Sequence, residues 1–417
     1  MNTKKQNTVK GQTLLRERNV SVVVDKIYSG GPITNREIVN NTYISFAKVN
    51  TITSMLNKIG LIIEDGKEES IGGRRSTLYN INRNFRYTVG CQLSHTRIHG
   101  IIGNLKGEII LEEVRPYNKE DGKEAVINSL IDLIDQVIKK SNIPVNKILG
   151  IGLSIAGLYN PNDGTAIPFP HLVKWGNVAF KEILAEKFKL PSYILNVANA
   201  AALAEQNFGL GKNKNSILYL NVGTGLGMGI ILNEKLYEGV SGSAGEFGHI
   251  SVDDHGPLCE CGNLGCLEAI ASTQAIVKQA KALLHEGVSS SLMTLVDHDV
   301  NKIDFDLICH AANESDKLAY NLIDKMGQNL GEGIVTLINL FNPERIIIGG
   351  KIGSAKNIVS TSIMNIVQKR ALEIPRRNTE IVFSKMGSHS GTIGATVPII
   401  DEFFKNQINA YLDKNLS

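Results

Sequence analysis

The 417-residue chain is poor in cysteine and has no long run of apolar residues. Five cysteines are too few at this length for a disulfide-stabilised scaffold. We expect no membrane-spanning helix, because no run reaches the roughly 18 apolar residues that a bilayer requires. Residues 1–30 also lack the apolar stretch and small-residue cleavage site of a secretory signal. These absences together favour a cytoplasmic protein in a reducing environment.

Charge is nearly balanced over the whole chain but unevenly distributed along it. The formal net charge is +3, whereas residues 1–83 contain 13 Lys and Arg against 7 Asp and Glu. A basic front segment on a mildly acidic body suits a polyanion that contacts the front segment only. A solvated surface would explain the same imbalance, and on charge alone it is the favoured explanation.

Residues 1–83 show a pattern of three helices followed by a β-hairpin. The first helix ends at the Ser-Gly-Gly-Pro stretch of residues 29–32. The second opens with a capping box, in which Thr34 and Glu37 satisfy each other's backbone N–H groups. Ser45 is placed to cap the third helix and Gly60 to close it. Helical spacing predicts which residues lie on the buried sides of the first and third helices. They are Val20, Val23, Val24 and Ile27 in the first helix and Phe46, Val49, Ile52, Thr53 and Leu56 in the third.

The second and third helices, joined by a short turn, are typical of a helix-turn-helix. In such a unit the second helix enters the major groove of DNA, and the outward residues of its first turns reach base edges. The residues expected to contact DNA bases are Ser45, Lys48, Asn50 and Thr51.

After the third helix, the sequence predicts a wing. Apolar stretches at 61–63 and 77–81 flank a polar turn around Asp65-Gly66. The loop ends in Arg74 and Arg75, two cations that could contact phosphates or enter a minor groove. A three-helix interaction module that never touches DNA is the alternative. The capped helices together with the basic wing favour DNA binding.

The remaining residues, 84–417, alternate between strand-like and helix-like stretches. This alternation predicts an α/β fold. We expect a DNA-binding domain at 1–83 and a larger domain at 84–417, with a boundary near 82–85 and no low-complexity linker. The expected strands are 87–93, 98–104, 108–114, 148–154, 193–196, 217–222, 228–232 and 345–348, and the expected long helices lie near 121–140 and 317–341.

Three of the five cysteines lie within eight residues, in the segment CECGNLGC at 259–266. Three thiolates with one nearby imidazole suit tetrahedral structural zinc, and an odd number of thiols counts against simple disulfide pairing. His255 is the alternative fourth ligand because it also lies close by. Cys91 and Cys309 have no such neighbours and are expected to be small buried residues. We therefore predict a structural zinc site with the ligands His249, Cys259, Cys261 and Cys266.

These segments resemble the ROK family of sugar kinases and repressors over nearly the whole chain. The resemblance is strongest in GTGLG at 223–227, in GSAGEFGH at 242–249 and in the cysteine segment up to Glu268. NPERIIIGG at 342–350 is similar to a late strand and glycine pair of the family. Residues 1–83, with GGRRS in the wing, resemble the DNA-binding domain of the repressor branch, nearest the xylose repressors. The resemblance implies a body of two actin-like, ribonuclease H-like lobes around a cleft.

The resemblance also implies a sugar or sugar-derivative effector and a homodimer, with a higher homo-oligomer as the alternative. A sugar needs several fixed hydrogen-bond partners, because its hydroxyls lose water on binding. In this interpretation His249 both binds zinc and faces the sugar, and the zinc loop holds two carboxylates at the rim of the cleft. The sugar contacts of the family map here onto Asn196, Glu246, His249 and Glu268.

Residues that the family kinases use for phosphoryl transfer are missing. Those kinases have Asn-Asp at the start of a helix, with the Asp as base, whereas this chain has Asn196-Val197. Their phosphate-binding Asp-x-Gly-Gly-Thr corresponds here to 92–96, where Ser94 and His95 replace glycines and Gln92 replaces the carboxylate. The GTGLG loop alone is a weak indication of nucleotide binding, because a tight turn between strands explains it.

We therefore expect no catalytic residue and no enzyme activity. The prediction is a sugar-responsive transcriptional regulator of the repressor kind, with double-stranded operator DNA as its partner. An ATP-dependent sugar kinase with a DNA-binding head is the alternative, and a scaffold without either ligand is a third possibility.

Overall fold

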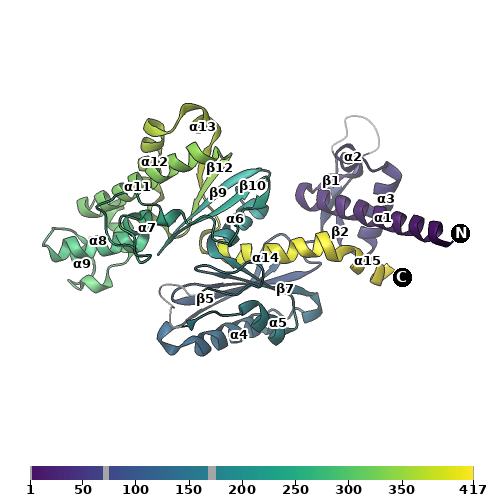
Figure 1. Cartoon of the computed structure of the whole chain (residues 1–417), viewed down its shortest axis with the longest axis horizontal. Helices are drawn as coiled ribbons and strands as arrows, with labels where there is room; N and C mark the ends of the chain where they lie inside the picture. Colours follow the sequence, from purple (N-terminus) through teal and green to yellow (C-terminus); the bar gives the residue numbers. More distant parts are fainter. Residues whose placement is uncertain (1, 69–74, 168–174, 417) are drawn as a thin grey trace.

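The computed structural model describes residues 2–68, 75–167 and 175–416. It contains an N-terminal unit of helices with a small sheet, followed by two larger lobes that are each built on a five-stranded sheet (Figure 1). A helix drawn in yellow, α14 (Ser390–Glu402), runs from the body toward the N-terminal unit. The α/β fold class expected from the sequence is confirmed.

The N-terminal unit combines three helices with three short strands. α1 (Asn2–Gly30), α2 (Asn35–Asn40) and α3 (Phe46–Lys58) pack around β1 (Ile33–Thr34), β2 (Ile62–Lys67) and β3 (Thr77–Ile81), which pair in the order β1-β3-β2. The predicted capping box opens α2: the backbone N–H of Thr34 donates to Glu37 Oε2 (2.8 Å), and that of Glu37 donates to Thr34 Oγ1 (3.2 Å). The four apolar residues expected on the inner side of α1 are all buried.

Two local predictions in this unit are wrong. Phe46 was expected on the buried side of α3 but is 56% exposed, because it is the first helical residue and lies outside the core that Val49 and Leu56 enter. Asp65-Gly66 does not form the hairpin turn. It lies inside β2, where the register with β3 shifts and Gly66 takes a φ of +89°. Because Gly66 absorbs this irregularity, the strand continues to Lys67.

The first lobe is built on a mixed sheet in the order β6-β5-β4-β7-β8. Its strands are β4 (Tyr87–Leu93), β5 (Arg97–Asn104), β6 (Ile109–Pro116), β7 (Ile148–Ile155) and β8 (Ser192–Asn196). The first three form an antiparallel meander, and the last two join in parallel. The amphipathic helices α4 (Lys123–Lys140) and α5 (Phe180–Phe188) cover one face and share an apolar core with the strands (Figure 1).

The second lobe has a sheet in the order β11-β10-β9-β12-β13. Its strands are β9 (Ser216–Val222), β10 (Leu226–Leu232), β11 (Lys235–Leu236), β12 (Arg345–Gly349) and β13 (Glu380–Phe383). The helices of this lobe are α7 (Leu267–Ala271), α8 (Thr273–His285), α9 (Leu292–Leu295), α10 (Phe305–Asn313), α11 (Lys317–Phe341), α12 (Lys356–Arg370) and α13 (Glu373–Asn378). Within the described ranges, no helix combines the length and apolar character needed to cross a bilayer.

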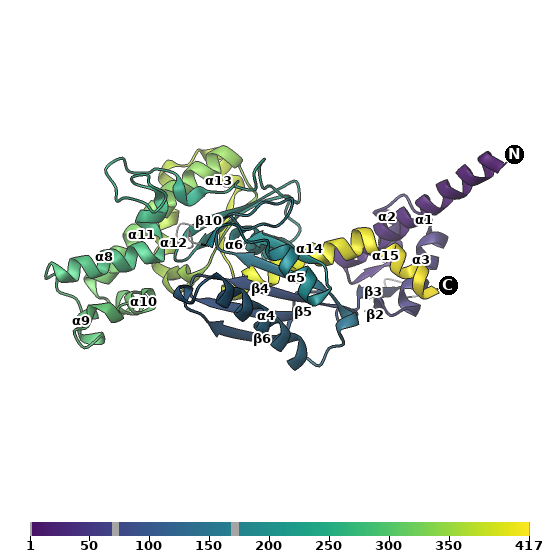
Figure 2. The same cartoon turned by 60° about the horizontal axis from the view of Figure 1, so that its bottom comes forward.

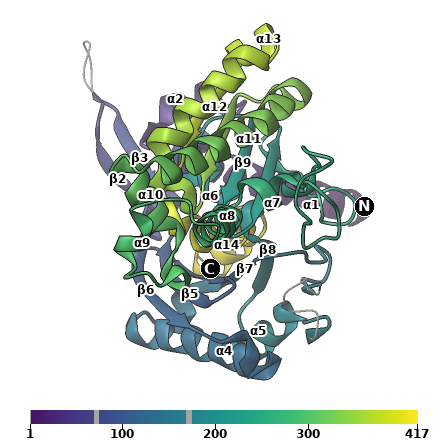
Figure 3. The same ribbon diagram turned by 90° about the vertical axis from the view of Figure 1, so that its left-hand side faces the viewer.

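Two helices, α6 (Val197–Phe208) and α14, lie between the two sheets and pack against each other (Figures 1 and 3). The contacts leave no room for side chains at two glycines. A methyl group at Gly152 of β7 would lie 1.8 Å from the carbonyl oxygen of Ala395, and one at Gly394 would lie 1.6 Å from that of Ala200. Glycine is therefore required where α14 meets the first sheet and α6.

At its far end α14 continues through a π-helical turn, η8 (Phe403–Gln407), into α15 (Ile408–Leu416), which lies beside α1 (Figures 1 and 2). The rings of Tyr28 and Phe404 are 4.7 Å apart between centroids. Asn409 Nδ2 donates to the carbonyl oxygen of Glu17 (3.4 Å). The core of the N-terminal unit thus includes Phe403, Phe404, Ile408 and Leu412 from the C-terminal segment.

Replacing Phe404 with Ala should loosen the N-terminal unit selectively. Removing this buried ring is expected to cost about 3–5 kcal/mol of stability and to speed hydrogen exchange in α1, while β9 and β10 stay protected. Phe46→Ala is the matched control, because that ring is largely exposed and its loss should change stability by less than about 0.5 kcal/mol. Equal protection of α1 in the two variants would contradict the packing role of the C-terminal segment.

Candidate metal and sugar site

The cysteine segment forms a compact turn between a short 3-10 helix, η4 (Phe247–His249), and α7. The backbone N–H of Cys259 donates to the carbonyl oxygen of Asn263 (2.8 Å), and an isolated β-bridge pairs Ser251 with Cys266. At Gly265 the φ angle is +65°, and a methyl group there would lie 1.6 Å from a neighbouring carbonyl oxygen. The glycines of the segment therefore allow the chain to fold back and bring its sulfur atoms together.

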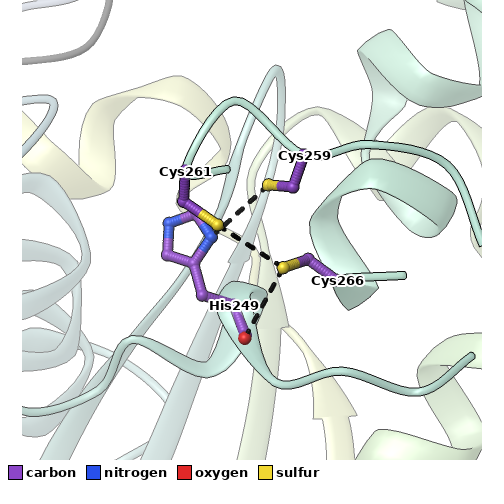
Figure 4. Close-up of side chains that lie close together, drawn as sticks. All are labelled: His249, Cys259, Cys261 and Cys266. Carbon is purple, nitrogen blue, oxygen red and sulfur yellow. Dashed lines mark hydrogen bonds between the residues drawn. The ribbon is translucent and has the colours of Figure 1, made fainter. Parts of the chain in front are cut away.

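Four side chains converge on one point of this turn (Figure 4). Cys259 Sγ lies 3.6 Å from His249 Nδ1, and Cys261 Sγ lies 3.6 Å from Cys266 Sγ. One ligand atom from each of the four residues fits within a mutual distance of 4.8 Å. The cluster can therefore hold a metal ion. His255, the alternative fourth ligand, lies outside it and is exposed.

A bound cation would change the protonation of the thiols in this cluster. Burial raises the pKa of Cys266 to about 12 and also raises the pKa of Cys259. A hydrogen bond from the backbone N–H of Asn263 lowers the pKa of Cys261. Without a cation, the two buried thiols would stay protonated at neutral pH, whereas a divalent ion would displace their protons and bind the thiolates. Three thiolates and one imidazole form a donor set that fits zinc.

His249 faces the cysteines and a carboxylate with different ring nitrogens. Its Nδ1 points to Cys259, and its Nε2 lies 3.7 Å from Glu246 Oε2. Burial raises the pKa of Glu246, His249 opposes this rise, and the nearby charge of Glu268 adds to it. Glu268 Oε2 accepts a hydrogen bond from the backbone N–H of Leu226 (2.8 Å), the first residue of β10. Three of the four expected sugar contacts thus lie near one another in the second lobe.

Asn196, the fourth expected sugar contact, belongs to the first lobe and caps α6. Its Oδ1 accepts from the backbone N–H of Ala198 (2.7 Å), and its Nδ2 donates to the carbonyl oxygen of Gly157 (2.8 Å). These two bonds fix the orientation of the amide. Val197, which stands where the family kinases have their base, is the first residue of the helix and is 8% exposed.

A contact beside these residues was missed by the sequence analysis. The hydroxyl of Tyr159 donates to the carboxylate of Glu238, and a methyl group at Gly242 would lie 2.9 Å from the Tyr159 carbonyl oxygen. Tyr159 is buried, and burial together with the Glu238 charge raises its pKa. The pair ties the loop that leads to Glu246 to the first lobe. No motif marks it, because the two residues are 79 positions apart.

The residues expected to contact DNA lie on the outer side of α3 and on the wing. Ser45 is the N-cap residue, and no backbone N–H donates to its side chain there. Asn50 Oδ1 accepts a hydrogen bond from Asn35 Nδ2 (3.3 Å). The hairpin of β2 and β3 projects from the unit (Figure 3). Arg74 lies outside the described residues. The exposed candidates are Ser45, Lys48, Asn50, Thr51 and Arg75.

The sequence profile of the ROK family matches residues 88–402, well over half of the chain. The chain belongs to the ROK family. The resemblance seen in the GTGLG and cysteine segments is thereby confirmed. The structure explains the GTGLG stretch as the tight connection between the antiparallel strands β9 and β10, in which the Gly223 N–H donates to the Gly225 carbonyl oxygen (2.9 Å).

Individual ROK proteins are similar over most of the chain. The xylose repressor of Caldicellulosiruptor bescii is 34% identical over 390 residues, which cover 94% of this chain and 97% of the repressor. The crystal structure of a ROK family transcriptional regulator homologous to the Escherichia coli MLC protein has a TM-score of 0.78 and 28% identity, and the match covers 96% of this chain and 100% of that one. A Streptomyces griseus ROK glucokinase, solved with glucose and AMPPNP, has a TM-score of 0.66 and 28% identity, covering 74% and 97%.

Replacing both Cys259 and Cys261 with Ser should remove the metal bound by the cysteine cluster. Two of its four ligands are lost, so the chain should release about one equivalent of zinc, measured by mass spectrometry of the metal after gel filtration. Cys309→Ala is the control, because this buried cysteine lies outside the cluster. Full zinc content in the double variant would reject the ligand set.

Proposed function

We propose that this chain is a sugar-responsive, DNA-binding transcriptional repressor whose kinase-like body binds a sugar without phosphorylating it. Operator DNA would be bound by the N-terminal unit, and the domain boundary is placed near residue 83. The body would hold structural zinc at the cysteine cluster. Two copies of the chain would act together as a homodimer.

The observation that supports this function best is the N-terminal unit itself. It presents the polar side of α3 and an extended hairpin on the outside, while its apolar residues pack against the C-terminal segment of the same chain. The xylose repressor matches this chain across nearly its full length, as does the MLC-like regulator structure. The glucokinase matches 74% of it. The similarity to regulators therefore extends over more of this chain than the similarity to the kinase does.

The former phosphate-binding segment supports the absence of catalysis. The backbone N–H of Ser94 donates to the carbonyl oxygen of Arg97 (3.0 Å), so this donor is used to close the β4–β5 turn. Its hydroxyl donates to the same carbonyl oxygen (2.8 Å). Val197 offers no group that accepts a proton from a sugar hydroxyl. Both the base and the phosphate-binding loop of a kinase would thus have to be supplied elsewhere.

We place the sugar beside Asn196, Glu246, His249 and Glu268. The first is fixed by its capping bonds, and the last is fixed by the backbone of β10. A zinc ion would hold His249 from the other side and so limit the motion of the loop that presents Glu246. Because Asn196 lies in one lobe and the other three in the second, an occupied site would favour one relative position of the lobes.

The signal to DNA would follow α14. This helix packs against the first sheet and α6, and its extension packs against α1. A change in lobe position would therefore reorient the N-terminal unit. In a homodimer, two such units must match half-sites about one helical turn apart, so a small reorientation weakens simultaneous binding. A coupling of about 1–3 kcal/mol corresponds to a change in affinity of roughly 5–150-fold.

Replacing Arg75 with Ala should weaken DNA binding and reduce its salt dependence, whereas replacing Lys48, an expected base contact, should reduce the preference for the selected sequence. Each lost phosphate contact lowers the slope of log affinity against log salt by about one. The slope is measured by fluorescence anisotropy on DNA fragments selected from a random pool by the wild-type protein. Lys302→Ala, an exposed lysine of the second lobe, is the control and should leave the slope unchanged. An unchanged slope in Arg75→Ala would remove the wing from the DNA interface, and an unchanged sequence preference in Lys48→Ala would remove α3.

A thermal-shift screen with xylose, glucose and N-acetylglucosamine should identify a sugar that stabilises the chain. Glu246→Gln should weaken the binding of that sugar by about tenfold or more, since a hydrogen bond to a charged group is worth about 1.5–3 kcal/mol. Glu260→Gln, an exposed carboxylate of the cysteine turn, is the control. Adding ATP should yield no sugar phosphate, and sustained turnover would instead establish a kinase with a DNA-binding head.

A further inference from the structure

A second group of metal-ligating side chains lies in the first lobe, apart from the cysteine cluster. His99 is in β5 and Glu112 is in β6, the neighbouring edge strand. His389 is in a short 3-10 turn, η7 (Gly387–His389), which lies between β13 and α14. The three residues thus come from two strands of the first sheet and from the connection that leaves the second sheet.

The three side chains are close enough to share one ion. His389 Nε2 lies 2.8 Å and His99 Nε2 lies 3.6 Å from Glu112 Oε2. The two imidazole rings are 5.4 Å apart between centroids. One ligand atom from each residue fits within a mutual distance of 4.8 Å. Ligands around a tetrahedral ion with bonds of about 2.0–2.1 Å are about 3.3 Å apart. The His389–Glu112 pair would therefore open slightly and the wider pairs would close for all three to bind one ion.

The hydrogen bonds within this group leave one buried ring nitrogen without a partner among the described residues. The contact between His389 and Glu112 is a hydrogen bond, but the Nε2 atom of His99 is buried and has no hydrogen-bond partner among the described residues. The His99 side chain is only 9% exposed and faces Glu112. A buried ring nitrogen without a partner is costly, and a bound cation would satisfy it.

The donor atoms at this position, two imidazole nitrogens and one carboxylate, suit a cation. Burial, and after it the neighbouring His389, lower the pKa of His99. The hydrogen bond from His389 lowers the pKa of Glu112, which therefore stays ionised. Glu112 and His389 are partly exposed, which leaves a route for an ion from solvent.

We propose that His99, Glu112 and His389 form a second metal site, which takes a divalent transition-metal ion of the zinc or cobalt class. Two imidazoles and one carboxylate are ligands that such ions accept, with the remaining position open to water. Thiolate-preferring monovalent copper and oxygen-preferring magnesium suit this donor set less well.

The site would join parts of the molecule that move relative to each other in the proposed function. His389 lies at the point where the chain passes from the second sheet to α14, and the other two ligands belong to the first sheet. A bound ion would fix the start of α14 to β5 and β6. Metal occupancy would therefore limit the lobe movement that α14 passes on to the N-terminal unit.

Metal content of the full-length chain tests this site without any DNA or sugar. The protein is stripped with a chelator, loaded with Zn²⁺, passed through a gel-filtration column and measured for bound metal per chain. His389→Ala and Glu112→Gln should each bind one ion fewer than wild type. His310→Ala, an exposed histidine on α10, is the matched control and should bind as many ions as wild type. Circular dichroism confirms that each variant is folded.

Cobalt distinguishes this site from the cysteine cluster. In the Cys259→Ser, Cys261→Ser double variant, Co²⁺ should still give weak visible bands of a nitrogen and oxygen site, without thiolate-to-metal charge transfer. Adding His389→Ala to the double variant should abolish those bands. The affinity of the chain for Co²⁺ should then fall by at least about tenfold. Equal metal content in wild type and His389→Ala, or no Co²⁺ bands in the double variant, would overturn the proposal. Neither result depends on whether the chain represses transcription.

Discussion

The backbone contact of α14 with β7 and α6 is the constraint on which the rest of the structure depends. At Gly152 and Gly394 any side chain would collide with a carbonyl oxygen of the facing element. Packing this tight has few alternative positions, because interiors of native density resist gradual deformation. One helix is thereby locked to the first sheet and to α6, which in turn covers the second sheet. Its extension completes the core of the N-terminal unit.

The residues proposed to bind sugar and metal depend on this framework through short chains of contacts. Asn196 is fixed because it caps α6, and Glu268 is fixed because β10 supplies its hydrogen bond. The cysteine turn is fixed differently. Its buried thiols are stable as ligands only when a cation compensates their charge. The second lobe therefore contributes a loop that a bound ion would stabilise further, and the first lobe contributes a residue whose position is set by secondary structure.

Much of the fold could be predicted from periodicity and turn chemistry. The capping box at Thr34 and the alternating strands of both lobes follow local rules, and the structure places their ends within a few residues. The errors arise where tertiary contacts decide. Gly66 extends a strand instead of ending it, and Phe46 lies outside the core. The cysteine cluster was visible because its residues are close in sequence. The group of His99, Glu112 and His389 was not, because only the sheet and the α14 connection bring these residues together.

The hydrogen bond between Asn409 and Glu17 joins residues that are 392 positions apart. During translation, α1 leaves the ribosome long before the segment that covers its apolar side has been synthesised. Until α15 emerges, part of this apolar surface stays exposed, and exposed surface of this kind promotes aggregation. A prematurely terminated product would lack the final piece of its own N-terminal core.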